Sequence, residues 1–381
     1  MRSTNSFNLI IIYACTILTL CTLYAVQPIQ PLFETEFSLS RLQAVIFTTA
    51  IMLPLGFAPI LYGYILESFS LKRFLRIAVL ILGVLELAFA YSDSYFILLS
   101  IRGLQGLLIP AILTSLMSYI SFITPKEHVQ QAMGYYIAAT IFGGFIGRLL
   151  SGLSSDIFGW RAFFIFLGFS LIVVFWLLSY IQEEARVDFV KPKLKQILEV
   201  LHVKTFLNIY LMMFFIFFVF QAVLNFLPFQ LQNISSQMGF SKVGLMYAGY
   251  IIGFVISMRV LKLIGFFKTE QRAIIAGIVI YTLGLQMFHI SSYSVMFVAM
   301  FVLCAGFFII HAVASGLISK LAHERRAISN GLYLSFYYAG GAVGTFAPGV
   351  FFEYLGWHVF ILLLSFIILS TLFFALKVNK N

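Results

Sequence analysis

Apolar runs separated by short polar segments follow one another along the whole chain. Each run reaches about 20 residues, the length that a helix needs to cross the hydrocarbon core of a bilayer. Lipid cannot satisfy bare backbone groups, so every run is predicted to be helical. The runs predict twelve spans, at 7–31, 44–66, 74–92, 94–123, 128–155, 160–181, 204–232, 243–265, 272–290, 293–320, 327–354 and 356–377.

The same pattern of glycines occurs twice, at an offset of 197 residues. The matching pairs are Gly143 and Gly340, Gly147 and Gly344, Gly152 and Gly349, and Gly159 and Gly356. Duplicated membrane bundles are a common design of secondary transporters. We therefore predict an all-α integral membrane protein with two pseudo-symmetric six-helix bundles, at 1–181 and 204–381.

The longest polar stretch, 182–203, separates the two repeats and is predicted to be a cytoplasmic linker. Leu194, Ile197, Leu198 and Leu201 fall at the spacing of one helix face, with lysines nearby. This pattern is typical of a short helix that lies on a membrane surface. A simple tether of suitable length explains the stretch equally well.

Composition agrees with a membrane protein and limits its partners. The chain is 61% hydrophobic and 10% charged, whereas a soluble domain carries about 25% charged residues. With the N-terminus inside, eighteen of the 24 lysines and arginines lie on the cytoplasmic side, and only Arg41, Arg161 and Lys242 lie outside. This bias predicts cytoplasmic termini. The net charge of +10 therefore reflects topology and contact with anionic lipid rather than nucleic-acid binding.

The sequence lacks the motifs of an enzyme. It contains no Walker loop, no metal-ligand helix pair and no context for a catalytic triad. Its three cysteines lie inside apolar runs and have no metal-like spacing. We expect neither a cofactor nor a metal.

Arg102, in the fourth span, starts the run Arg102-Gly103-Leu104-Gln105-Gly106. A charge inside a membrane normally faces a cavity or a partner. The run resembles the R-x-x-Q-G pattern in the fourth helix of the major facilitator superfamily. In proton-coupled exporters of that superfamily this arginine is associated with proton coupling. The alternative is a structural arginine that binds neighbouring carbonyls and holds helices together.

The loop after the second span resembles a degraded form of the superfamily's loop signature. Gly63, Glu67, Lys72 and Arg73 match that signature in kind, while Ser68 and Ser70 depart from it. The resemblance implies a gating role for the four matching residues. An ordinary basic cytoplasmic loop is the alternative.

The fifth span contains Gly143-Gly144-x-x-Gly147-Arg148 and is followed by Gly159-Trp160-Arg161. It resembles the antiporter signature without its G-P pair, and more closely a subgroup of arabinose-efflux-permease-like proteins. Small residues four apart allow close helix approach. We interpret Gly143, Gly147 and their partners Gly340 and Gly344 as packing residues.

Glu86 is the one acidic residue that lies well inside a predicted span. Counted along their helices, Glu86, Arg102 and Arg148 reach a similar depth. They could form one charge cluster in which separation from the arginines lets the carboxylate take up a proton. A static ion pair is the alternative. His311 is a further candidate for proton coupling, because its ordinary pKa suits a proton switch; a hydrogen-bonded structural histidine is again the alternative.

Polar residues in the first and seventh spans are candidates for substrate contact, because these helices line the central cavity in the superfamily. They are Tyr24, Gln27, Gln221 and Asn225. Amides among many aromatic residues suggest a moderately apolar substrate that is uncharged or cationic.

The resemblance implies a secondary transporter of a bacterial inner membrane that exports a small organic molecule by proton antiport, with alternating access between two bundles. The expected partners are that molecule, protons and membrane lipid, and the chain is expected to act as a monomer. An importer of a sugar or metabolite and a non-transporting membrane sensor are the alternatives.

Overall fold

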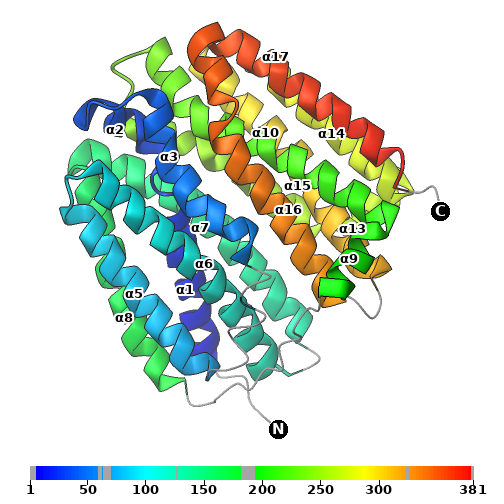
Figure 1. Ribbon diagram of the computed structural model, residues 1–381, viewed down its shortest axis with the longest axis horizontal. Coiled ribbons are helices and arrows are strands. Elements are labelled where there is room, and N and C mark those ends of the chain that lie inside the picture. Colours follow the sequence, from blue (N-terminus) through cyan, green and yellow to red (C-terminus); the bar gives the residue numbers. More distant parts are fainter. Residues whose placement is uncertain are drawn as a thin grey trace.

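The computed structural model describes residues 6–58, 62, 70–125, 128–181, 194–322 and 326–378. These residues form helices and turns, and the helices of the two sequence halves lie beside each other (Figure 1). A helix covers each of the twelve predicted spans over its described residues. Among the described residues, nine helices are long and apolar enough to cross a membrane by themselves.

The helices of the first half begin with a broken segment. Its elements are α1 (Ser6–Tyr24), η1 (Gln27–Ile29), α2 (Gln30–Glu36), α3 (Arg41–Met52), η2 (Leu53–Gly56), α5 (Leu71–Tyr91), α6 (Tyr95–Ile123), α7 (Val129–Ile157), α8 (Trp160–Leu177) and η4 (Leu178–Tyr180). Pro28 and Pro31 stand at the starts of η1 and α2. Proline lacks the amide hydrogen that a helix interior uses, and the regular α-helix of the first span is interrupted by η1 there.

The helices of the second half are as follows. They are α9 (Leu194–His202), α10 (Lys204–Ile234), α11 (Phe240–Met246), η5 (Tyr247–Gly249), α12 (Tyr250–Met258), α13 (Val260–Phe267), α14 (Glu270–Met287), α15 (Tyr293–Leu321), α16 (Arg326–Phe346) and α17 (Gly349–Ala375). α10 stays helical through Pro228. α17 contains a kink at Gly356, so its first turns extend the eleventh predicted span.

The amphipathic segment that follows 193 is helical, as its spacing predicts, and forms α9. The remainder of the predicted linker, 182–193, lies outside the described residues.

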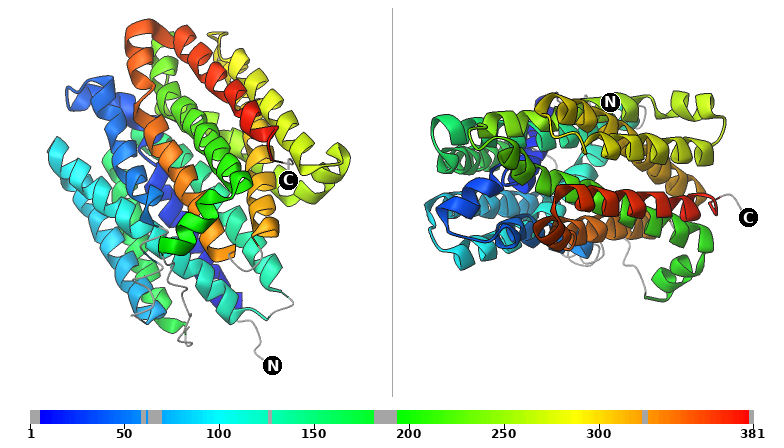
Figure 2. Two further views of the ribbon diagram at one scale, coloured as in Figure 1. Left: turned by 45° about the vertical axis from the view of Figure 1, so that its right-hand side comes forward. Right: turned by 90° about the horizontal axis from the view of Figure 1, so that it is seen from above.

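The two chain ends and α9 lie toward one end of the molecule, and α2 lies at the opposite end (Figures 1 and 2). We call the end with the start of α1 and with α9 the near end, and the end with α2 and the start of α3 the far end. The two halves lie side by side in each view of Figure 2.

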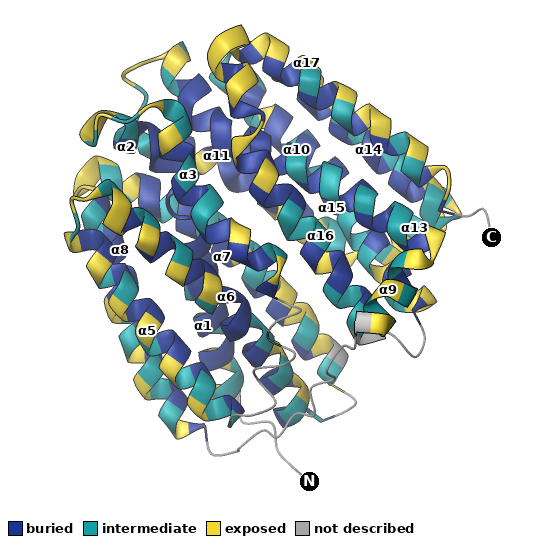
Figure 3. Ribbon diagram, viewed as in Figure 1, coloured by how far each residue is buried: buried dark blue, intermediate teal, exposed yellow. Residues whose placement is uncertain are grey.

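Burial is concentrated on the central helices (Figure 3). Two thirds of the most apolar window of α10 and of the first span is buried. Large apolar side chains such as Phe96, Leu261 and Phe366 are instead more than 70% exposed on outer surfaces. An exposed apolar belt of this kind is satisfied by lipid rather than by water.

The sequence repeat is also a structural repeat. The Tyr13 hydroxyl donates to the Ala132 carbonyl at 3.1 Å, and 197 residues later Tyr210 donates to the carbonyl of Ser329 at 3.0 Å. Gly159 and its mate Gly356 both have positive φ, at 85° and 78°. Positive φ favours glycine, because other residues place Cβ against the backbone there. The matched glycines therefore start the last span of each half with the same turn.

Candidate functional site

A cavity of about 150 Å³ lies between the halves. The first half contributes the C-terminal end of α1 and the middle of α7, and the second half contributes α10, α12, α15 and α16. The lining residues are Leu20, Tyr24, Ile137, Thr140, Ile141, Gly144, Phe217, Phe220, Tyr250, Ser257, Phe307, Phe308, His311, Leu334, Tyr337 and Tyr338. We call this space the central cavity.

Stacked aromatic rings form the wall of the central cavity on the second half. The ring centroids of Phe217 and Tyr337 lie 3.7 Å apart, and those of Phe220 and Phe307 lie 3.8 Å apart. Both pairs are close to parallel. This wall is rigid and apolar, and it suits a ligand with a flat or apolar body.

His311 is a polar member of this wall. Its ring stacks on Phe307 with a centroid distance of 5.8 Å, and its Nδ1 lies 2.9 Å from the Tyr333 hydroxyl. The structure thus places His311 at the cavity and also gives it a hydrogen-bond partner. Both alternatives for this residue, proton coupling and a structural role, are compatible with that position.

Buried amides join the two halves on the far-end side of the cavity. Gln27 Nε2 donates to Gln221 Oε1 at 3.1 Å, and Gln30 Nε2 donates to Asn225 Oδ1 at 2.8 Å. All four side chains are fully buried. Of the predicted substrate residues, only Tyr24 lines the cavity, whereas Gln27, Gln221 and Asn225 face the opposite half. In this arrangement they close the far end.

Two further contacts extend this closure. The hydroxyls of Thr49, in the first half, and Thr345, in the second, lie 2.8 Å apart. Within the second half, Asn225 Nδ2 donates to the Thr345 carbonyl at 2.8 Å, and this bond is not part of the closure. At the outermost level, both carboxylate oxygens of Asp156 accept from the first turn of α11. Their donors are the amides of Phe240 and Ser241, each at 2.8 Å. We call this set of cross-half contacts the far-end gate.

Arg102 is fully buried and contacts three helices of the first half. Its guanidinium donates to the carbonyls of Phe47, Thr22 and Leu23 at 3.3, 2.9 and 3.1 Å. It also donates to Gln105 Oε1 at 2.9 Å. These contacts hold α1 and α3 against α6, as the structural alternative expects.

Glu86 is fully buried near Arg102, but the two do not form an ion pair within 4.0 Å. Neither carboxylate oxygen has a hydrogen bond within the described residues. Thr22 and Gln105 are its other polar neighbours, and Thr22 Oγ1 and Gln105 Nε2 also lack partners. Thr22, Glu86, Arg102 and Gln105 therefore form a polar cluster that is incompletely satisfied.

Arg148 lies apart from that cluster, so the expected single cluster of three charges is not formed. Its Nε donates to Gln27 Oε1 at 2.7 Å, and its Nη1 donates to the Gly144 carbonyl at 2.6 Å. Three tyrosine rings surround the guanidinium. Similar depth along a helix did not predict this separation, because α7 turns Arg148 toward the second half.

A model of the Major Facilitator Superfamily matches residues 12–268. The chain belongs to this superfamily. It is therefore a membrane transporter rather than an enzyme.

Relatives of the transporter agree with this family. An uncharacterized transporter of Buchnera aphidicola subsp. Schizaphis graminum is 26% identical and covers 100% of this chain and 93% of its own length. The inner membrane transport protein YnfM of Escherichia coli is 27% identical, over 91% of this chain and 84% of its own. An MFS-type transporter of Bacillus subtilis, YybF, is 24% identical over 94% and 89%.

Solved structures share the fold. The nucleoside transporter NupG superposes with a TM-score of 0.81 at 12% identity, covering 98% of this chain and 100% of that chain. A bacterial homologue of the human lysosomal transporter Spinster, in an inward-facing and occupied conformation, superposes with a TM-score of 0.78 at 15% identity. It covers 100% of this chain and 98% of that one.

The predicted gating residues of the transporter are only partly described. Gly63 and Glu67 lie outside the described residues. Lys72 donates to the carbonyl of Ser179 at 3.1 Å and also to that of Ile181, so it ties α5 to the end of η4. Arg73 is exposed.

The packing glycines lie where α7 and α16 cross the first helix of their own half. A Cβ on Gly143 or Gly147 would lie 2.7 Å from the Ile17 carbonyl oxygen or 2.6 Å from Cys21 Cα. On Gly340 or Gly344 it would lie 2.1 Å from the carbonyl oxygen of Phe214 or Phe218. No larger residue fits these positions without a backbone shift.

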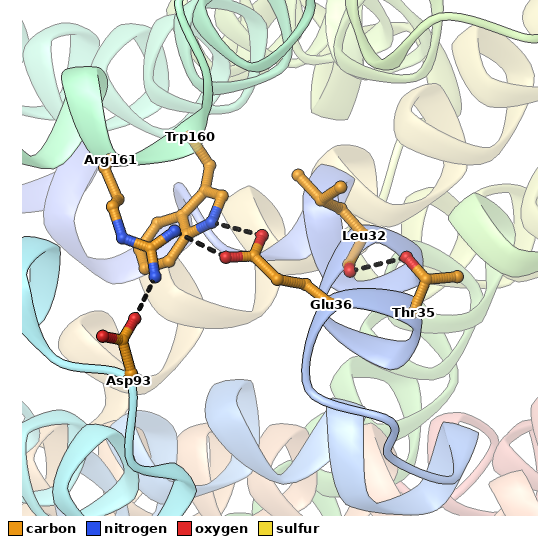
Figure 4. A network of polar contacts seen from close by, with 6 residues as sticks. All are labelled: Leu32, Thr35, Glu36, Asp93, Trp160 and Arg161. Carbon is orange, nitrogen blue, oxygen red and sulfur yellow. Dashed lines mark hydrogen bonds and ion pairs between the residues drawn. The ribbon is translucent and has the colours of Figure 1, made fainter.

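A network of charged side chains closes the first half at the far end (Figure 4). Arg161 contacts Glu36 and Asp93, and Trp160 Nε1 donates to Glu36 Oε2 at 2.7 Å. Charged pairs of this kind suit the rim of a membrane protein, where water and headgroups begin.

Sequence reasoning missed Tyr247, Tyr250 and Asp156 as members of the site. The tyrosines were hidden among many aromatic residues. Asp156 lies between the glycines of the fifth span and Gly159, and spacing along the chain does not indicate its partner on the opposite half.

Proposed function

We propose that this transporter exports a small organic molecule by alternating access, and that proton entry drives the export. One observation supports this proposal most strongly. The central cavity is walled by both halves, and it is closed on one side by contacts that all run between the halves. Separation of the halves at the far end would break every one of these contacts while leaving each bundle intact.

The far-end gate is built for reversible opening. Its members are neutral amide and hydroxyl pairs, together with the exposed contact of Asp156. A neutral hydrogen bond contributes about 0.5–1.5 kcal/mol net. A few such bonds sum to an energy that substrate and proton binding can overcome.

Proton coupling is assigned to Glu86. An ionised carboxylate without donors loses its solvation and gains little in return, and a bound proton removes that cost. Arg102 holds the carbonyls of Thr22 and Leu23. These residues directly precede Tyr24 at the cavity and the break of the first span. A change of charge on Glu86 would therefore act through Arg102 on the segment that carries both cavity and gate residues.

The proposed direction follows from topology. The lysine and arginine bias puts both termini in the cytoplasm of a bacterial cell. In that orientation, the near end faces the cytoplasm and the far-end gate faces outward. A cavity that is closed outward is ready to load a cytoplasmic substrate.

Transport into proteoliposomes with an imposed pH gradient tests this proposal. We expect the gradient to drive substrate movement in the wild type, and Glu86→Gln to abolish the gradient dependence while substrate still binds. Glu353→Gln is the matched control, because Glu353 is an exposed acid of α17 and should leave gradient-driven transport unchanged. Unaltered gradient-driven transport by Glu86→Gln would reject Glu86 as the coupling acid.

A further inference from the structure

Arg148 carries a buried positive charge that no acid of the described residues neutralises. Its side chain is fully buried, and its Nη2 has no hydrogen-bond partner in the part of the chain that the structure describes. The other two guanidinium nitrogens bind neutral oxygens, of Gln27 and Gly144. A cation at this depth normally pairs with an acid or marks a ligand pathway. One donor position of this cation is left open.

The open position lies directly behind the wall of the central cavity. The guanidinium carbon lies 4.0 Å from the ring centroid of Tyr24 and 4.9 Å from that of Tyr250. Both rings line the cavity, as does Gly144, whose carbonyl Arg148 binds. A movement of one tyrosine ring would expose the guanidinium to a ligand in the cavity.

The remainder of the cavity wall has no formal charge. Its residues are aromatic, aliphatic or small, with Thr140, Ser257 and His311 as polar members beside the tyrosines. No aspartate or glutamate of the described residues lines it. A cationic ligand would find no counter-ion there, whereas an anion would find Arg148.

We propose that the transported substrate is an organic anion with an apolar or aromatic body, and that its anionic group pairs with Arg148. This inference rests on the proposed function and names its substrate class. It replaces the expectation of an uncharged or cationic molecule, which considered the amides alone. A carboxylate is the simplest such group, because a guanidinium donates to it in a planar, charge-assisted pair.

The same pair would couple substrate binding to the far-end gate. Tyr247 and Tyr250 belong to the second half, and their rings stabilise the Arg148 cation from across the gate. Separation of the halves would withdraw both rings. A bound anion would compensate the cation at that moment, so the loaded transporter opens more readily than the empty one.

A matched ligand series on the full-length protein in nanodiscs tests the inference. The probes are benzoate, benzamide and benzylamine, and the corresponding cyclohexane carboxylate, carboxamide and methylamine. We expect the two carboxylates to bind at least tenfold more tightly than the amides of the same body, and the two amines to bind most weakly. Equal binding across the series, or a preference for the amines, would overturn the inference.

Variants locate the anion. Arg148→Gln should remove the preference for carboxylate over amide, and Arg148→Lys should keep part of it because the charge remains. Arg259→Gln is the control, because Arg259 is an exposed arginine of the second half; it should keep the full preference. An undiminished carboxylate preference in Arg148→Gln would also overturn the inference. If Arg148→Gln does not fold, the inference is tested by the ligand preference of the wild type and by its partial loss in Arg148→Lys.

A second readout separates this inference from the proposed function. Spin labels at Phe158 and Ile290, exposed far-end positions of opposite halves, report the distance across the gate. Opening with benzoate and not with benzylamine supports the inference. Opening with every probe alike rejects the anion and leaves alternating access intact. A gate that stays closed with all probes and at every pH rejects both.

Discussion

The two halves of the transporter share a scaffold position by position. Gly147 packs on Cys21, and 197 residues later Gly344 packs on Phe218. Tyr13 and Tyr210 bind carbonyls at matching positions. The repeat therefore preserves the contacts that bring helices together, which depend on small residues and backbone atoms.

The polar interior does not follow the repeat. The positions that match Glu86, Arg102 and Arg148 in the second half hold Leu283, Ala299 and Thr345. The second half instead supplies stacked aromatic rings to the cavity. Among the described residues, buried charge is thus confined to the first half, and the second half forms most of the apolar cavity wall. This division is what a transporter needs if one half responds to charge while the other holds the body of the substrate.

Substitution of Arg102 should have the largest effect on stability. Among the described residues, Arg102 is the buried charge of the first half with the most hydrogen bonds, and the second half has no equivalent of it. Arg102→Ala removes four hydrogen bonds and leaves Glu86 without its neighbouring cation. A hydrogen bond to a charged group contributes about 1.5–3 kcal/mol. We expect a large fall in the midpoint of thermal unfolding in detergent.

The equivalent position in the other half is the control. Ala299→Ser should change stability by less than about 1 kcal/mol, because a serine hydroxyl can bond within its own helix. A stable, fully active Arg102→Ala variant would show that the arginine network does not hold α1 and α3 in place.

The next largest effect on stability should come from enlarging one of the packing glycines that the two halves share. Gly344→Ala forces a Cβ to within 2.1 Å of the Phe218 carbonyl oxygen, and overpacking of this kind costs about 1–3 kcal/mol. Gly331→Ala, in the same helix, meets open space and should be neutral or slightly stabilising. Equal unfolding midpoints for the two variants would contradict the close approach of α10 and α16.

The scaffold was largely predictable from the sequence, for a physical reason. Lipid permits few structures, so long apolar runs indicate helices, and a repeat of glycines indicates repeated helix contacts. The positions of Gly143, Gly147, Gly340 and Gly344 could be interpreted without a partner in view, because close approach requires a small residue whichever helix approaches.

The site was less predictable, because its contacts join distant parts of the chain. Gln27 and Gln221 are 194 residues apart, and either could have faced substrate. Arg148 shares its depth with Glu86 but not its direction. Rotation about a helix axis and the approach of the opposite half decide such contacts, and neither leaves a local pattern in the sequence.

Substitution of Asp156 should have a smaller effect. It concerns the N-termini of α3 and α11, which are equivalent helices of the two halves. α3 begins with its own capping box, in which Ser40 and Gln43 bind each other's backbone. α11 begins after Gly239 without a cap of its own, and Asp156 of the opposite half caps it instead. Loss of a cap costs about 0.5–2 kcal/mol, and here that cost falls only on the closed gate.

We therefore expect Asp156→Ala to shift the far-end gate toward opening, with little change in the stability of either bundle. The distance between spin labels at Phe158 and Ile290 measures the shift. Glu353→Ala is the matched control at the equivalent position, because no hydrogen bond or ion pair joins Glu353 to the opposite half in the described structure. A gate distribution that is the same in both variants would mean that Asp156 does not stabilise closure.

The smallest expected effect on stability concerns Arg161 and His358. These residues occupy equivalent positions at the far end of the two halves, and we call each of them with its contacts a corner. Arg161 forms ion pairs with Glu36 and Asp93, whereas His358 stacks on His289 with their Nδ1 atoms 3.0 Å apart. Burial, and then the proximity of His358, lower the pKa of His289. The folded protein therefore binds fewer protons than the unfolded chain at this residue. The contribution of the pair is complete above the ordinary histidine pKa of about 6.5 and decreases as the pH falls below it.

We expect the midpoint temperature of unfolding to decrease when the pH is lowered from 7.5 to 5.5. His289→Gln should make this decrease slightly smaller. Protonation of both rings removes the acceptor that their hydrogen bond requires, and glutamine does not titrate. Asp93→Asn is the comparison in the other half: it removes one ion pair from the Arg161 corner and leaves the histidine pair in place, so it should keep the pH dependence of the wild type. If His289→Gln has the same pH dependence as the wild type, the histidine pair does not make the second half more sensitive to acid than the first.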